Sequence, residues 1–131
     1  MYKGTLIALG GGYDDDLIKL IRSEICPLHS NIEVIATAAT EPKESGIAYK
    51  EAFEELGCNK VQFMLIDENH AADQPEYISR IQQADVIFFT GGDQVRLIEF
   101  LHGTQLLEIM RRRYHHEPII IAGTSAGAAI M

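Results

Sequence analysis

The chain has 131 residues, which suits one domain with a substantial hydrophobic core. With 47% hydrophobic and 23% charged residues, its composition is that of an ordinary globular protein. The formal net charge of −8 argues against a nucleic-acid partner, because phosphate backbones bind basic surfaces. A cationic substrate would suit this charge, although many soluble proteins are acidic for solubility alone.

The sequence shows no signal peptide and no membrane span. The apolar run at residues 6–9 is far too short for a signal peptide, and no stretch approaches the about 20 apolar residues of a membrane span. We therefore expect a cytoplasmic protein without a membrane partner. Cys26 and Cys58 lack metal-type spacing and are expected to be reduced, buried thiols, with a disulfide or a nucleophilic role as the alternatives.

Apolar runs alternate with helical patterns along the chain. Helix 14–26, for example, places Leu17, Ile18, Ile21 and Ile25 on one face. Strands without polar alternation, each separated by a helix, predict a mostly parallel sheet covered on both faces, so we predict a single doubly wound α/β domain over residues 1–131. The expected strands are 5–9, 33–38, 61–66, 85–90 and 118–122, and the expected helices are 14–26, 43–56, 75–83, 93–101 and 104–115.

Small residues follow most of the predicted strands. In such a sheet, ligands bind outside the carboxyl ends of the strands, where the loops converge. Small residues let the backbone approach a ligand closely and permit positive φ angles. The loops concerned are residues 10–12, 37–40, 91–94 and 123–127.

Residues 123–127 read Gly-Thr-Ser-Ala-Gly, a G-x-S-x-G pattern placed directly after a buried strand. Such an elbow presents its serine, here Ser125, as a nucleophile for acyl transfer. The backbone N–H of Ala126 would be one oxyanion donor, and Gly92 in the 91–92 loop would supply a second. The alternative interpretation is a tight strand-to-helix turn without chemistry.

The loop at residues 91–94 reads Gly-Gly-Asp-Gln. The side-chain amide of Gln94 can both donate to and accept from polar groups of a substrate. Alternatively, Asp93 caps the following helix and Gln94 is only solvated.

No nucleotide, cofactor or metal site is expected. Residues 10–12 are three glycines, but the dinucleotide pattern G-x-G-x-x-G fails at Asp15. The second strand leads into Thr37 rather than an acidic ribose ligand, and the aspartates at 14–16 would repel phosphates. These aspartates fit a capped helix N-terminus better than a metal site.

A serine nucleophile needs a base, and His70 is the only histidine expected in a loop after a strand. His115 and His116, together with the arginines at 111–113, are typical of the cationic end of a helix. We therefore expect the base to lie beyond Met131. The full set of candidates is His29, His70, His102, His115 and His116.

Two motifs together resemble the cyanophycinase family. They are residues 123–131 (GTSAGAAIM) and 89–94 (FTGGDQ), and residues 37–41 and 52–57 also match the family's usual run. That family comprises serine peptidases related to aspartyl dipeptidase (peptidase E), with a class I glutamine-amidotransferase-like fold. The resemblance covers nearly all of this chain but about the N-terminal half of the family's length. It implies that residues 1–131 are the N-terminal part of a longer catalytic domain.

The resemblance implies a peptide substrate. It is cyanophycin, a polyaspartate backbone that carries arginine on its side chains and is cleaved by an exopeptidase to β-aspartyl-arginine through an acyl-enzyme. Ser125 matches the nucleophile, and Gln94 and Thr124 are expected to bind substrate. The family's histidine and acidic partner follow the elbow, so no residue here takes those roles. Tyr13 departs from the pattern, because an acidic residue usually follows the first glycines.

Two other functions stay open. One is an aspartyl dipeptidase of the peptidase E type, with the same nucleophile and a different pocket. The other is a non-catalytic fragment or binding module that lacks the base. In a chain that stops at Met131, the final apolar strand would lack cover, so we expect the isolated chain to be inactive and to self-associate. Homodimer formation is also left open.

Overall fold

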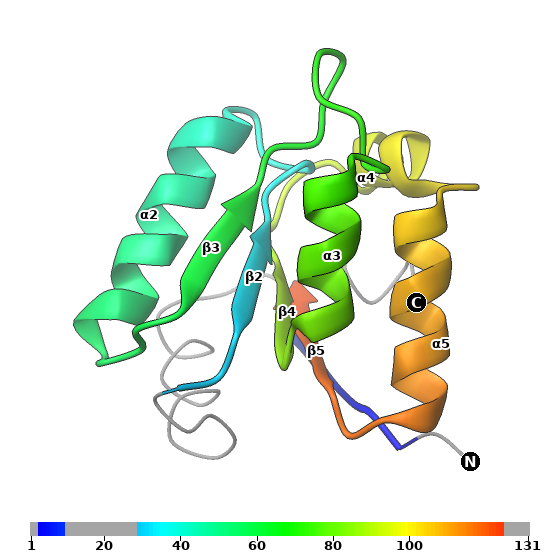
Figure 1. Cartoon of the computed structure of the whole chain (residues 1–131). Helices are drawn as coiled ribbons and strands as arrows, with labels where there is room; N and C mark the ends of the chain where they lie inside the picture. The colour runs from blue at the N-terminus through cyan, green and yellow to red at the C-terminus, as the bar shows by residue number, and fades with distance from the viewer. Residues whose placement is uncertain (1–2, 10–28, 125–131) are drawn as a thin grey trace.

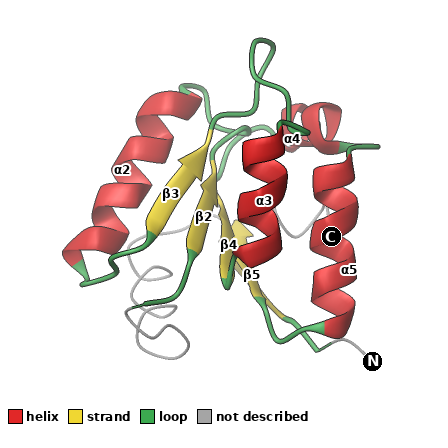
Figure 2. Cartoon of the chain, in the orientation of Figure 1, coloured by secondary structure: helices red, strands yellow, loops and turns green. Residues whose placement is uncertain are grey.

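The computed structural model describes residues 3–9 and 29–124, which contain the following strands and helices. Five strands form one sheet in the order β1-β5-β4-β2-β3, and every pair is parallel (Figure 1, Figure 2). The mostly parallel α/β sheet predicted from the apolar runs is therefore confirmed. The strands are β1 (Thr5–Leu9), β2 (Ile32–Ile35), β3 (Val61–Met64), β4 (Val86–Phe89) and β5 (Ile120–Thr124).

Helices cover both faces of the sheet. Figure 1 shows α2 on one side and α3 and α5 side by side on the other, while α4 lies at the carboxyl ends of the strands. The predicted helix 14–26 lies outside the described residues. None of the helices in ranges 3–9 and 29–124 is long and apolar enough to span a bilayer. The helices are α2 (Pro42–Glu55), α3 (Pro75–Gln83), α4 (Gln94–Leu101) and α5 (Gln105–His116).

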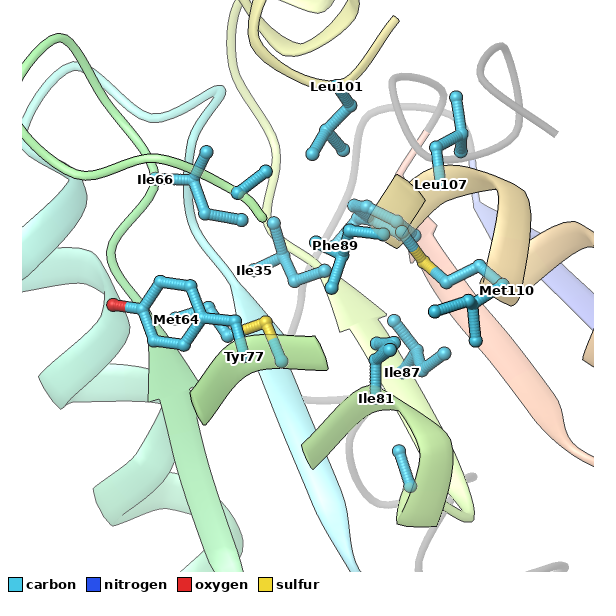
Figure 3. Packing of buried hydrophobic residues seen from close by; sticks show 14 of the residues in the cluster. Ile35, Met64, Ile66, Tyr77, Ile81, Ile87, Phe89, Leu101, Leu107 and Met110 are labelled. Carbon is cyan, nitrogen blue, oxygen red and sulfur yellow. The ribbon is translucent and has the colours of Figure 1, made fainter. Parts of the chain in front are cut away.

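Two hydrophobic clusters, one on each face, explain why the central strands show no polar alternation. Val86 and Phe88 of β4 belong to the cluster under α2. Ile87 and Phe89 of the same strand belong to the cluster under α3 and α5, which Figure 3 shows. All four side chains have no exposed surface, and burying each contributes about 2 kcal/mol.

The fifth strand differs from its predicted bounds at both ends. It begins at Ile120 rather than at residue 118, and it continues through Gly123 and Thr124. Pairing decides this, because Gly123 has partners on both sides, Ala8 in β1 and Phe89 in β4. The first two residues of the Gly-Thr-Ser-Ala-Gly motif are therefore strand and not turn.

The expectation that the final strand would lack cover is wrong. β5 lies between β1 and β4 within the sheet. Its side chains Ile120, Ile121 and Ala122 are 6%, 0% and 1% exposed. The apolar exposure at this side of the sheet falls instead on β1, where Leu6 is 39% exposed.

The outer edge of β3 is closed by side chains from α3. Arg80 donates from Nη2 to the carbonyl oxygen of Phe63 at 2.9 Å. The Tyr77 hydroxyl accepts from the Leu65 N–H at 3.1 Å and donates to the Leu65 carbonyl oxygen at 3.2 Å. Backbone groups that are already bonded cannot pair with a further strand, so α3 protects the carboxyl end of this edge.

A buried ion pair anchors α3 to β2. Glu33 is 4% exposed, and Arg80 contacts both of its carboxylate oxygens, at 2.5 Å and 3.1 Å. Burial raises the pKa of Glu33 above its ordinary value, and the hydrogen bonds from Arg80 oppose that shift. Such a pair contributes little net stability when intact, but the loss of one partner leaves an uncompensated buried charge.

Glu33→Gln is expected to lower the free energy of unfolding by about 3 kcal/mol, because Arg80 loses its buried carboxylate partner and keeps only Glu76, whose side chain is 71% exposed. Urea unfolding measures this change. Glu54→Gln is the matched control, since it removes the exposed Lys50–Glu54 pair, with side chains 35% and 44% exposed, and is expected to cost less than about 1 kcal/mol. Equal losses in the two variants would contradict the structural role of the buried pair.

Candidate active site

The loops that follow β2 and β4 contact each other at the carboxyl edge of the sheet. The N–H of Thr90 donates to the carbonyl oxygen of Ile35 at 3.1 Å. Three residues later, the N–H of Asp93 donates to the carbonyl oxygen of Ala38 at 2.8 Å. The loop after β4 is therefore fixed to the loop after β2 at both of its ends.

Gly92 makes the closest backbone approach in this contact. Its φ of +140° favours glycine. A Cβ at this position would overlap the Ala38 carbonyl oxygen and lie 2.5 Å from its carbonyl carbon. Among the described residues, the Gly92 N–H meets no acceptor. The local backbone thus combines a position that only glycine fits with a donor that an incoming oxygen could use.

β5 brings the chain to the same edge. A Cβ on Gly123 would lie 2.5 Å from the carbonyl oxygen of Phe89, so β5 packs tightly on the end of β4. Thr124 is the last described residue, and its backbone pairs with Leu9. Ser125 and Ala126, the predicted nucleophile and oxyanion donor, lie outside the described residues.

Asp93 and Gln94 have separate roles at the start of α4. The Asp93 carboxylate accepts from the N–H of Val95 at 2.9 Å and from that of Arg96 at 3.4 Å. The helix-capping interpretation of Asp93 is therefore confirmed. Gln94 is the first residue of α4, and its side chain is exposed. Its amide remains accessible to a peptide at this edge.

The comparison with protein families identifies the family to which a chain with this site belongs. The model of peptidase family S51 matches residues 6–131, which include all of β1 except Thr5 and every later element. The chain belongs to peptidase family S51.

Curated relatives of this S51 peptidase include cyanophycinases. The one from Synechococcus elongatus is 34% identical over 134 residues, covering 99% of this chain and 42% of the relative. The one from Trichormus variabilis is 32% identical, covering 98% of this chain and 45% of the relative. The chain spans less than half the length of these relatives.

Solved structures show the same fold. A peptidase from an acI-B1 Actinobacterium has a TM-score of 0.68 at 26% identity, covering 97% of this chain and 56% of that structure. A putative peptidase E protein from Listeria monocytogenes has a TM-score of 0.73 at 23% identity, covering 98% and 61%. The second likeness concerns the fold alone.

Most candidate histidines of this S51 peptidase lie far from the end of β5. His29 precedes β2, at the amino edge of the sheet. The C-terminus of α5 reaches the same edge, because the carbonyl oxygens of Tyr114 and His115 accept from the N–H groups of Gly4 and Lys3. This places His115 and His116 opposite the predicted site. His102 is exposed and follows α4.

His70 lies at the carboxyl edge but follows the wrong strand for a base. Its Nδ1 lies 2.8 Å from Asp67 Oδ1, and this hydrogen bond lowers the pKa of Asp67. β4 and β2 stand between β5 and β3, so the strand ends are separated by about 14 Å at the usual strand spacing. His70 is therefore paired with Asp67 and remote from the end of β5.

Two residues at this edge were not predicted from the sequence. Thr90 is 1% exposed, and its hydroxyl has no hydrogen-bond partner among the described residues. Arg96 donates from Nε to the carbonyl oxygen of Thr37 at 2.9 Å. Thr90 could have been suspected as the polar residue that ends the run Val-Ile-Phe-Phe, whereas Arg96 gave no signal because its partner is distant in sequence.

A cleft of about 530 Å³ opens beside the Gly91–Gly92 backbone. Its other wall is the N-terminal turn of α2 and the loop before it, which contribute Thr40, Glu41, Glu44 and Ser45. The named wall residues include two carboxylates and no cationic side chain. In ranges 3–9 and 29–124, no group of three or more histidine, cysteine, aspartate or glutamate side chains could hold a metal ion.

Gly92→Ala is expected to reduce peptide hydrolysis by about 100-fold, because the new Cβ must displace the loop from Ala38. Gly103→Ala is the matched control: its φ of +75° is also strained for alanine, but nothing lies within 4 Å of a Cβ there. Each variant also pays about 1–2 kcal/mol of backbone strain. Turnover assays and urea unfolding on both variants separate the effect of displacing the loop from the effect of backbone strain. Equal activity in the two variants would refute the role of Gly92.

Proposed function

We propose that this S51 peptidase is a serine-type exopeptidase that hydrolyses cyanophycin to β-aspartyl-arginine, with Ser125 as nucleophile. The observation that carries the proposal is the likeness to cyanophycinases at 32–34% identity over nearly the whole chain. The family match supports peptide hydrolysis in general. Ser125 directly follows Thr124, the last residue of β5, which ends at the edge where the Gly92 loop lies.

The proposed reaction proceeds through an acyl-enzyme. Ser125 Oγ attacks the scissile carbonyl carbon while its proton passes to a base, and the N–H groups of Ala126 and Gly92 bind the oxyanion. The base then protonates the leaving amine, and water hydrolyses the ester. Each oxyanion donor is worth about 3 kcal/mol of barrier. That the histidine and its acidic partner lie beyond Met131 stays a prediction.

The charge of the cleft supports a substrate that carries arginine. Glu41 and Glu44 line its α2 wall, next to the Gly91–Gly92 backbone. A guanidinium group in this cleft would pair with carboxylates in its planar donor geometry. Gln94 and Thr124 are proposed to bind the peptide backbone, which requires both donors and acceptors.

A cytoplasmic location fits an enzyme that acts on cyanophycin inside cells. Homodimer formation is compatible with the reaction but not required by it, because every proposed site residue comes from one chain.

Ser125→Ala is expected to abolish hydrolysis of cyanophycin, with a loss of about 10⁴-fold or more, because no other group forms the acyl-enzyme. Release of β-aspartyl-arginine from the polymer, followed by chromatography, measures it. Ser79→Ala on the exposed surface of α3 is the control and is expected to retain activity. Unchanged activity in Ser125→Ala would remove the nucleophile assignment.

A second measurement distinguishes the substrate class. A full-length version of the wild-type protein, which includes the predicted base, is expected to cleave the β-aspartyl-arginine polymer and to leave free α-Asp-X dipeptides intact. Cleavage of the dipeptides alone would favour an aspartyl dipeptidase instead. Glu44→Gln is expected to raise the KM for the polymer several-fold, because a carboxylate of the cleft is lost.

A further inference from the structure

The first turn of α4 is held by two consecutive carbonyl groups of the loop after β2. The Ala38 carbonyl oxygen accepts from the N–H of Asp93 at 2.8 Å. The Thr37 carbonyl oxygen accepts from Arg96 Nε at 2.9 Å. Gln94 lies between these two anchor points, and Gly92 directly precedes them. Both candidate site residues are therefore placed by a segment that is fixed at each end.

Arg96 also binds a third loop. Its Nη1 and Nη2 lie 3.0 Å and 3.4 Å from the two carboxylate oxygens of Glu68, in the loop between β3 and α3. Its guanidinium lies 5.1 Å from the centroid of the Phe100 ring, one turn further along α4. Figure 1 shows the β3–α3 loop projecting beyond the carboxyl end of β3. One side chain thus joins the loops after β2 and β3 to α4.

The loops that Arg96 joins are already ordered locally. The Thr37 hydroxyl donates to the carbonyl oxygen of Ile66 at 3.0 Å. Asp67 and His70 exchange backbone hydrogen bonds at 3.1 Å and 3.3 Å, which close the turn that contains Glu68. Arg96 therefore connects loops that are already ordered by their own contacts. Its loss is expected to change the relative positions of these loops and not whether they fold.

We propose that Arg96 is a positioning residue for peptide hydrolysis, which acts by holding Gly92 and Gln94 in place; this inference rests on the proposed function. Folding stability alone does not account for the contacts of Arg96 with Thr37 and Glu68. The Glu68 side chain is 64% exposed, and exposed ion pairs contribute little to the free energy of folding. Placement matters far more, because a 1 Å displacement of a site group can cost about 100-fold in rate.

The planar guanidinium is necessary for this role. Nε reaches Thr37 while the two terminal nitrogens reach Glu68, which uses the donors of one rigid group in two directions. The single ammonium of lysine has no such fork, so Arg96→Lys is expected to behave more like Arg96→Ala than like the wild type.

Turnover of cyanophycin by a full-length version that includes the predicted base tests the proposal. Arg96→Ala and Arg96→Lys are each expected to lower kcat by about tenfold or more with KM changed less than about threefold, because oxyanion placement is affected. Arg112→Ala, an exposed arginine of α5, is the matched control and is expected to retain wild-type kcat. Wild-type kcat in Arg96→Ala, measured well below its unfolding temperature, would overturn the proposal.

A double-mutant cycle with Gln94→Ala separates positioning from general destabilisation. If Arg96 acts partly through Gln94, its replacement is expected to cost about threefold in the Gln94→Ala background instead of about tenfold. A merely structural role would give the same fold loss in both backgrounds. Full additivity would therefore contradict the coupling.

Amide hydrogen exchange tests the positioning role of Arg96 independently of hydrolysis. Arg96→Ala is expected to speed exchange of the Asp93 N–H at least tenfold, while the Asp85 N–H, bonded to Asn31 at 2.8 Å, is unchanged. Unchanged exchange at Asp93 would overturn the positioning role whatever the substrate. Activity that survives in Ser125→Ala, or no hydrolysis by a full-length version that includes the predicted base, would instead reject the proposed function.

Discussion

The candidate site depends on the contact between the loop after β4 and the carbonyl group of Ala38. That carbonyl oxygen accepts the Asp93 N–H, and the Gly92 backbone lies so close to it that no Cβ fits between them. The contact decides where α4 begins and leaves the Gly92 N–H without an acceptor in the described part of the chain. Within the described residues, a donor without an acceptor is thereby held at the carboxyl edge of the sheet.

Because the sheet is all-parallel, this contact lies at the edge where ligands bind in such folds. Because every strand points the same way, the segments after β2, β4 and β5 all reach one edge. β5 is flanked by β1 and β4, and its side chains enter both hydrophobic clusters. The strand that leads into Ser125 is therefore among the most constrained in the described part of the chain, which suits the proposed nucleophile because such a group needs a rigid support.

The sequence allowed the sheet and the glycine-rich edge to be predicted, because both follow from local patterns. Runs such as residues 86–89 are apolar throughout since each side chain enters one of two clusters. Strand ends were less predictable, because pairing decides them: Gly123 extends β5 through its partners in β1 and β4. Arg113 lies in the cationic last turn of α5, as expected, but its burial was not predicted: it is 9% exposed and donates to the carbonyl oxygens of Ile81 and Ala84. Contacts that span 29 to 32 positions leave no local pattern.

Three arginines show how this acidic chain uses guanidinium groups. Arg80, Arg96 and Arg113 each donate to a backbone carbonyl that secondary structure leaves unpaired, and each also binds a carboxylate. Such a carbonyl, if buried without a partner, would cost about 1–3 kcal/mol. The carboxylate partner of Arg80 is buried, so the effect of that residue falls on stability. The partner of Arg96 is largely exposed and its carbonyl lies at the carboxyl edge, so its effect falls on the geometry of the site. A guanidinium that binds both a carbonyl and a carboxylate therefore stabilises the core at Arg80 and positions the site at Arg96. The difference follows from whether the carboxylate partner is buried or exposed.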